Sequence, residues 1–438
     1  MKTALGCLGL LFAASACFAQ MYTVTDLGTL GGSQSLANGI NASGQVVGWS
    51  YTADDNFIHA FRTAPNSPIN AGRDDLHTLA GVSGSVAYGI NDSGQVAGVS
   101  FLPHNKVVHA FRTASNKRIN PAKDDLGTLG GTASYGYGIN SSGQVVGMSL
   151  ITGDLGEHAF RTAANSPINP NTDDLGTLGG AFSPFIGGIS YAQGINESGQ
   201  VVGWSYRMNP ISEHVFRTAP DSSINPATDD LGALPRTPDA IPASYGYGIN
   251  AFGQVIGYSL VGGVTFPPTV HAFRTAPNSL INPATDDLGT LGGVQSVAYS
   301  INASGQVVGY SFISGNSTVH AFLYSGGAMH DLNNLIPPGS GWELVAAYGI
   351  NDTAQIVGEG IHNGQARAFL LTISDEAVVQ QPINADESNI SATMEVVPVC
   401  WRDARLHSSP ACARQLQFLN WMHSNGIEVE PISDDPER

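Results

Sequence analysis

The sequence predicts an all-β protein: a seven-bladed β-propeller whose N-terminal strand closes the last blade, with a small C-terminal appendage containing one helix. Three observations lead to this prediction. Only 12% of the 438 residues are charged and 53 are Gly, which disfavours exposed helices, whose surfaces are usually rich in Glu, Lys and Arg. The hydrophobic fraction of 42% is large enough to form a core. Above all, one unit of about 50 residues recurs along most of the chain.

Three short motifs define the unit. Gly-Ile-Asn ends at Asn41, Asn91, Asn140, Asn196, Asn250 and Asn351, with Ser-Ile-Asn at Asn302. His-Ala-Phe begins at His59, His109, His158, His271 and His320, with variants at His214 and Arg367. Asp-Leu begins at Asp26, Asp75, Asp125, Asp174, Asp230, Asp287 and Asp331. Each motif occurs seven times in the same cyclic order, so we count seven units.

Each unit is predicted to contain four short strands. In the second unit these are residues 86–91, 95–100, 107–114 and 125–129. Asp92-Ser93-Gly94 joins the first two strands, with Gly where a hairpin needs a left-handed residue. Continuous apolar runs such as the one around Val46 and Trp49 are typical of strands covered on both faces.

The two ends of the repeat region complement each other. The chain enters with residues 22–27, a single Asp-Leu strand, and leaves after Arg367-Ala368-Phe369, a third strand with no fourth. The entering strand can therefore complete the last unit and cover its edge. An open solenoid is the alternative, but it would not need complementary half-units.

The motifs carry a family resemblance. His-Ala-Phe, Asp-Leu-Gly-Thr-Leu-Gly-Gly and Gly-Ile-Asn-x-Ser-Gly-Gln-Val-Val-Gly resemble those of the extracellular HAF-repeat family, named after its His-Ala-Phe triplet, over residues 22–372. The resemblance implies an exported bacterial repeat protein, and it supplies neither a reaction nor a ligand. In length and strand number the unit also resembles kelch repeats.

The N-terminus predicts export. Lys2 precedes an apolar stretch, and small residues follow, so residues 1–19 are typical of a signal peptide. Residues 14–17 offer an alternative, a lipoprotein box that would make Cys17 a lipid tether. We expect a secreted or periplasmic protein, with an outer-membrane lipoprotein as the less favoured location, and no membrane span.

The C-terminal region has no repeat motif. We expect a linker over residues 374–395 and a disulfide-pinned helical tail over residues 396–438. Cys400 and Cys412 are predicted to form the disulfide, since two thiols in an oxidising compartment usually pair.

The charge excludes one class of partner. With 18 Lys and Arg against 35 Asp and Glu, the net charge is −17, which disfavours binding to nucleic acid or to anionic lipid. We expect a monomer that binds carbohydrate or protein at the cell envelope.

The repeated polar residues are expected to be structural. The triplet histidines lie in different units and so cannot converge on one zinc ion; we expect them to bond backbone groups, with no metal and no cofactor. Five units contain both an Asp-Asp pair and an Arg after the triplet, such as Arg161 with Asp173 and Asp174. A cross-strand Arg–Asp pair explains both, and calcium binding is the alternative.

A binding site is expected where the repetition breaks. Longer loops in units four, five and seven bring an aromatic and polar set to one rim. This candidate set is Phe182, Phe185, Arg236, Asp239, Phe266 and Trp342. The sequence therefore favours an exported, non-catalytic binding or scaffolding module. The alternative is a hydrolase or lyase acting on an extracellular polymer, through groups such as His330, Glu343, Glu359 or His362.

Overall fold

Strands dominate the structure. The computed structural model describes residues 21–81, 84–102, 107–179, 188–208, 211–234, 242–262 and 268–374. Helical structure in these ranges is confined to α1 (Ala71–Asp74) and two 3-10 turns, η1 (Thr152–Asp154) and η2 (Leu332–Leu335). The predicted all-β class is confirmed. The described ranges contain no helix that is both long and apolar enough to cross a membrane.

Each unit forms a small antiparallel sheet. The first three units contain β2 (Gly31–Ile40), β3 (Val46–Thr52), β4 (Ile58–Arg62), β5 (Ser85–Ile90), β6 (Val96–Phe101), β7 (Val108–Arg112), β8 (Gly130–Ile139), β9 (Val145–Ile151) and β10 (Glu157–Arg161). The fourth and fifth contain β11 (Ser190–Ile195), β12 (Val201–Met208), β13 (Ile211–Arg217), β14 (Ser244–Ile249), β15 (Val255–Leu260) and β16 (Val270–Arg274). The last two contain β17 (Gly292–Ile301), β18 (Val307–Ile313), β19 (Val319–Ser325), β20 (Ala328–Asp331), β21 (Trp342–Ile350), β22 (Ile356–His362) and β23 (Gln365–Ile373). One parallel bridge, Val270 to Gln295, joins the fifth and sixth sheets.

The N-terminal strand belongs to the last sheet. β1 (Tyr22–Asp26) pairs antiparallel with β23, in register from Tyr22 opposite Ile373 to Asp26 opposite Phe369. The prediction that the entering strand completes the last unit is confirmed at the level of strand pairing. The edge of β23 is thereby covered.

The predicted fourth strand is mostly reduced to a single residue pair. In the first five units the Asp-Leu segment makes only an isolated antiparallel bridge, such as Phe61 to Asp75. Two residues later the backbone turns to positive φ, at +70° in Gly127, and pairing ends. The sixth unit differs because Gly326 and Gly327 form a tight turn between β19 and β20, which keeps the two strands paired.

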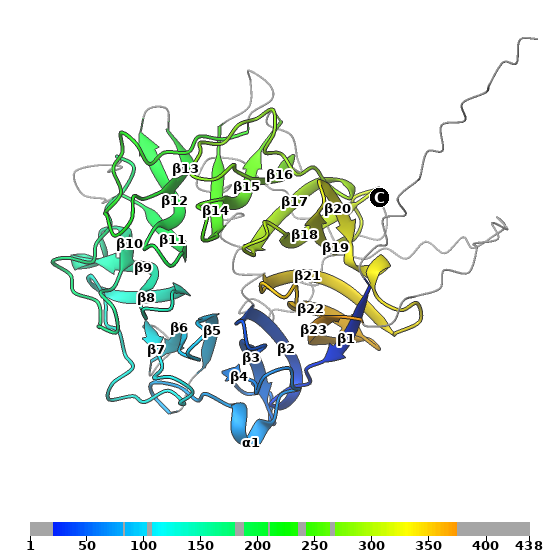
Figure 1. The fold of residues 1–438 in the computed structure, drawn as a ribbon. Coiled ribbons are helices and arrows are strands. Elements are labelled where there is room, and N and C mark those ends of the chain that lie inside the picture. The colour runs from blue at the N-terminus through cyan, green and yellow to red at the C-terminus, as the bar shows by residue number, and fades with distance from the viewer. Residues whose placement is uncertain are drawn as a thin grey trace, which may run out of the picture. The chain divides into compact units, whose positions relative to one another are not determined.

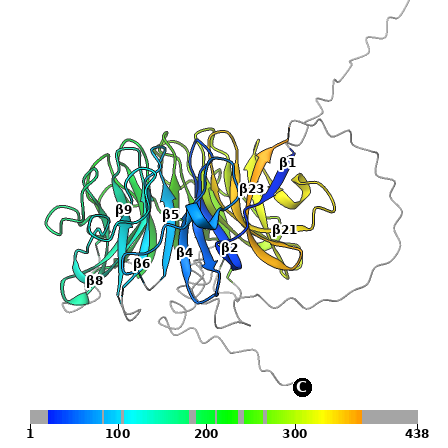
Figure 2. The ribbon, with the colours of Figure 1, turned by 90° about the horizontal axis from the view of Figure 1, so that it is seen from below.

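Neighbouring sheets pack face to face and share their cores. Each sheet contacts the next along the chain, and β2 also contacts β21, β22 and β23 of the last sheet (Figure 1). One core combines Leu27, Val46 and Phe61 with Val357 and Leu370, and so joins the first sheet to the last. Seen from the side, strands of successive sheets stand next to one another (Figure 2).

The triplet phenylalanine is a core residue in every unit. Its side chain is fully buried at Phe61, Phe111, Phe160, Phe216, Phe273, Phe322 and Phe369. Full burial of a side chain of this size stabilises a fold by about 2–3 kcal/mol. This burial accounts for the recurrence of the apolar half of the triplet.

The Gly-Ile-Asn hairpins form a continuous cycle of hydrogen bonds. Asn41 Nδ2 donates to the backbone oxygen of Asn91, and each later asparagine donates to the next at 3.0–3.3 Å. The last, Asn351 Nδ2, donates to Asn41 O at 3.1 Å. The seven hairpins, far apart in the sequence, are thus linked in a closed succession.

Candidate functional site

Every Asp-Leu aspartate is paired with a histidine. In six units the partner is the triplet residue: His59 Nδ1 lies 3.0 Å from Asp75, and His158 Nδ1 lies 2.9 Å from Asp174. In the last unit Arg367 replaces the triplet histidine, and His362 of β22 takes over, 2.8 Å from Asp26. The expectation that these histidines bond backbone groups holds for His214, whose Nε2 lies 2.8 Å from Pro242 O. The partner that recurs in every unit, however, is a carboxylate within the same sheet.

The same carboxylate also fixes the following turn. Asp174 Oδ1 accepts the backbone N–H of Gly176 at 2.8 Å, as well as facing His158. Burial works to raise the pKa of Asp174, but the hydrogen bonds from His158 and Gly176 outweigh it and hold the pKa below its ordinary value. Asp174 is therefore a charged structural anchor at neutral pH.

The predicted Arg–Asp pairs are not formed. Arg62 donates to the backbone oxygens of Gly94 and Lys117 in the next unit, at 3.1 Å each. Arg161 similarly reaches Ser222 O at 3.1 Å, and its ion pair at 3.9 Å is with Asp221 rather than with Asp173 or Asp174. These arginines donate to backbone oxygens of the following units and so link adjacent sheets.

The first aspartate of each pair closes its own loop. Asp74 Oδ2 accepts the backbone N–H of Asn70 at 2.8 Å, and Asp124 Oδ2 accepts that of Asn120 at 2.7 Å. Burial lowers the pKa of Arg62, and the negative charge of Asp74 offsets only part of this effect. The paired sequence Asp-Asp thus reflects two separate structural tasks.

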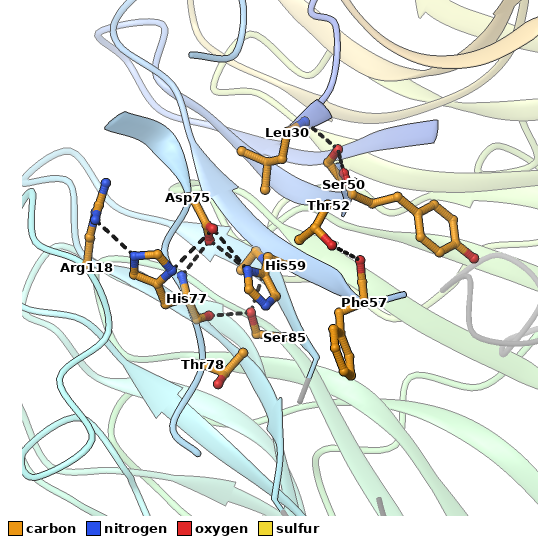
Figure 3. A network of polar contacts seen from close by, with 12 residues as sticks. Leu30, Ser50, Thr52, Phe57, His59, Asp75, His77, Thr78, Ser85 and Arg118 are labelled. Atoms are coloured by element: carbon orange, nitrogen blue, oxygen red, sulfur yellow. Dashed lines mark hydrogen bonds and ion pairs between the residues drawn. The ribbon is translucent and has the colours of Figure 1, made fainter. Parts of the chain in front are cut away.

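The first unit has a histidine at the turn position after its Asp-Leu motif, where five other Asp-Leu motifs are followed by Gly. His77 occupies the position of Gly28, Gly127, Gly176, Gly232 and Gly289, with the same positive φ, at +61°. Its side chain lies beside the regular His59–Asp75 pair: His77 Nδ1 is 3.2 Å from Asp75 Oδ2 (Figure 3). The result is a cluster of two imidazoles around one carboxylate.

A second departure contacts the first. Arg118 stands where the first and third units have Pro68 and Pro167. Arg118 Nη1 lies 2.9 Å from His77 Nε2, and Nη2 donates to Gly72 O at 2.7 Å (Figure 3). Two positions that break the repeat, 41 residues apart in the sequence, therefore meet at the junction of the first two units.

An open cleft of about 780 Å³ lies at this junction. Its cationic side chains are Arg62, Arg73, Lys117, Arg118 and Lys123, and its anionic ones are Asp74 and Asp124. Both carboxylates already have partners, since Asp74 is bonded to Arg73 and Asp124 to Asn120. The ammonium groups of Lys117 and Lys123 have no hydrogen-bond partner within the described ranges, and both residues are exposed. The cleft is thus locally cationic on an acidic chain.

The predicted rim site falls largely outside the described residues. Phe182, Phe185, Arg236, Asp239 and Phe266 lie there, as do Cys17, Cys400, Cys412 and the predicted signal, linker and tail. Trp342 is described: its ring stacks on His362 at 4.6 Å and meets Phe369 edge-on. That packing gives Trp342 a structural role in the last sheet.

Three of the four residues named for the enzyme alternative, His330, Glu359 and His362, have structural partners. Tyr348 donates to Glu359 at 2.8 Å, His362 faces Asp26, and His330 Nε2 lies 3.3 Å from Ser325 O. Each of these contacts lies within one sheet. They give the hydrolase or lyase alternative no support.

Sequence reasoning missed both His77 and Arg118. The signal was present, because His77 is the one histidine at a turn position that Gly occupies in five other units. The sequence does not reveal, however, that the turn lies beside the triplet histidine of the same unit. The departures that matter at this junction are point substitutions, which leave the length of the unit unchanged, whereas the predicted rim site depends on insertions.

Comparisons with known proteins add no functional assignment. No family model matches the chain, and no curated protein matches it. Among solved structures, the chain is similar to a protein of unknown function from Dyadobacter fermentans, with 11% sequence identity and a TM-score of 0.34, over 80% of this chain and 99% of that one.

Proposed function

We propose that residues 22–373 form a seven-bladed β-propeller of the HAF-repeat type, exported from the cell, which acts as a non-catalytic binding module. The closed cycle of seven asparagine hydrogen bonds supports the arrangement, because each hairpin bonds the next and the last bonds the first. The pairing of β1 with β23 supports it as well. The signal-like residues 1–19 support export.

The cationic cleft carries the binding proposal. Lys117 and Lys123 present exposed ammonium groups, and Arg62 and Arg73 line the same hollow. Of the two ligand classes that the sequence leaves open, carbohydrate and protein, the lining favours an acidic carbohydrate. Amide side chains of Gln45, Asn116 and Asn120 line the cleft beside the cations and suit sugar hydroxyls. The local charge also explains how an acidic chain can bind an anion.

The test compares two variants of equal net charge. K117Q/K123Q removes two cleft charges, and S317E/N334D adds two negative charges at exposed positions of the sixth unit and its outgoing turn. On an array of acidic and neutral glycans, we expect the parent and S317E/N334D to bind acidic glycans. K117Q/K123Q should bind them about tenfold or more weakly, since each charge-assisted contact contributes on the order of 1 kcal/mol.

Three results would contradict the proposal. They are equal binding by the two variants, a preference for neutral glycans, and binding only to acidic proteins presented beside the glycans. Turnover of a bound glycan, detected as new reducing or unsaturated ends, would instead favour the hydrolase or lyase alternative.

A further inference from the structure

We propose that His59, Asp75 and His77 form a site for a divalent transition-metal ion of the zinc type. The three side chains each offer one ligand atom, and these atoms lie within 4.8 Å of one another. Two imidazole nitrogens and a carboxylate oxygen are a ligand set that zinc prefers, whereas magnesium and calcium favour all-oxygen sets. The site adjoins the cationic cleft through Arg118, but its ligands do not line the cleft, and the proposal does not rest on carbohydrate binding.

The two distances between the carboxylate and the imidazole nitrogens fit the ion with small adjustments, and the two imidazole nitrogens lie within 4.8 Å of each other. Two ligands of a tetrahedral zinc, bound at about 2.1 Å, lie roughly 3.4 Å apart. The distance from Asp75 Oδ2 is 3.0 Å to His59 Nδ1 and 3.2 Å to His77 Nδ1. An ion would replace the protons that these nitrogens now share with the carboxylate. Three protein ligands leave a fourth position open, as in zinc sites that bind water or a substrate.

The backbone holds the ligands in place before any ion binds. Asp75 Oδ1 accepts the backbone N–H of His77 at 2.7 Å, which leaves Oδ2 between the two imidazoles. Ser85 Oγ donates to His77 O at 2.6 Å and fixes the turn from the next sheet. The two imidazole rings stand nearly perpendicular, at 85° (Figure 3). Such preorganisation reduces the entropy cost of binding.

The other units supply a built-in comparison. His109 faces Asp125, and His158 faces Asp174, with the same geometry as His59 and Asp75. At the third position these units have Gly127 and Gly176. A lone His–Asp pair is too few ligands for a structural or catalytic zinc site, so the substitution to His77 is what creates the site.

Arg118 competes with the ion. A guanidinium can only donate, so His77 Nε2 accepts from Arg118 and the proton of the ring resides on Nδ1, facing Asp75. A metal on Nδ1 requires the other tautomer, with the proton on Nε2, where it would oppose Arg118. Metal binding is therefore expected to move Arg118 away from His77. Removal of Arg118 should tighten metal binding by about fivefold, the equivalent of one hydrogen bond of about 1 kcal/mol.

The test is a titration of the whole purified chain with Zn²⁺ by calorimetry, and with Co²⁺ followed by visible absorption. Because the cysteines and the remaining histidines can also take up metal, the informative quantity is the difference between variants. H77G restores the residue of the other units and suits the positive φ, so it is expected to fold. H109Q removes a triplet histidine from a unit without a third ligand.

We expect the parent and H109Q to bind one more equivalent of zinc than H77G, with the four-coordinate cobalt spectrum lost only in H77G. R118A should bind that equivalent about fivefold more tightly. The proposal is overturned if H77G takes up as much zinc as the parent with the same affinity, or if the parent and H77G show the same cobalt spectrum.

Discussion

At the scale of single residues, the His-Ala-Phe and Asp-Leu motifs recur together because the histidine of one contacts the aspartate of the other. The triplet histidine and the Asp-Leu aspartate lie 16 residues apart in five of the units, and their side chains meet where the Asp-Leu segment forms its single bridge to the triplet strand. The last unit supports the importance of the pair, because His362 replaces the missing triplet histidine from a different strand. The last sheet thus keeps a histidine opposite Asp26 although the triplet position holds Arg367, which indicates that the histidine–aspartate contact itself is required.

The first prediction concerns acid stability. The folded-state pKa values of Asp125, Asp174 and Asp331 lie below their ordinary values, since hydrogen bonds outweigh the effect of burial. A lowered folded pKa stabilises the fold above the unfolded pKa of about 3.9, and this stabilisation is lost as pH falls through the folded pKa. Thermal denaturation at several pH values should therefore show a steep loss of Tm below about pH 4.

The variant D174N isolates one contribution. It should lower stability by about 1–2 kcal/mol at pH 7, because a charge-assisted pair becomes a neutral one. Its loss of Tm on acidification should be smaller than that of the parent. A D174N chain that is destabilised equally at pH 7 and at pH 3 would contradict the assigned role of the carboxylate.

At the scale of elements, the sequence predicted the first three strands of the units well, and the fourth strand poorly in the first five units. The repeated motifs and Gly turns mark β5, β6 and β7 within one or two residues. The fourth segment fails as a strand because Gly at +70° follows the aspartate two residues later, at Gly127 and Gly176, and redirects the backbone. Propensity alone could not distinguish a strand of five residues from a single bridge.

The second prediction concerns β1. A chain that begins at Leu27 lacks β1, so β23 loses its antiparallel partner and His362 loses Asp26. Relative to a chain that begins at Met21, we expect a clearly lower Tm and concentration-dependent association through the exposed edge. A synthetic peptide of residues 21–30 should restore part of the Tm by pairing with β23. Equal Tm values for the two chains, without any effect of the peptide, would refute this role.

At the scale of the whole molecule, the sequence supplied the number of units and their order, and it left the contacts between units undetermined. The sequence did not predict the hydrogen bonds of the asparagine cycle. Each donor lies 49–56 residues from its acceptor, and 310 residues separate the two at the closing bond. The sequence also did not predict the cationic cleft, because the net charge of −17 describes the whole chain and gives no information on a local excess of cations. Contacts between repeats depend on packing, which a periodic pattern does not encode.

The third prediction tests the asparagine cycle. Asn196 is buried, its Nδ2 donates to Asn250 O, and its Oδ1 accepts the backbone N–H of Gln200. N196A removes both bonds and should lower the free energy of unfolding by about 1–3 kcal/mol. Asn56, in an exposed loop, is the control, and N56A should change it by less than about 0.5 kcal/mol. Urea denaturation measures both values. Similar losses in the two variants would argue against a special contribution of the cycle.

The pairing of β1 with β23 also determines how the protein would respond to tension. Tyr22 lies opposite Ile373, and Ser374 N donates to Met21 O, so the first and last described residues are at the same end of an antiparallel pair. A pull between residues 21 and 374 would load these hydrogen bonds one after another, as in unzipping, rather than all at once in shear. A pull applied at residues 21 and 374 would therefore separate β1 from β23 first, and the other sheets would bear load only after β1 has detached.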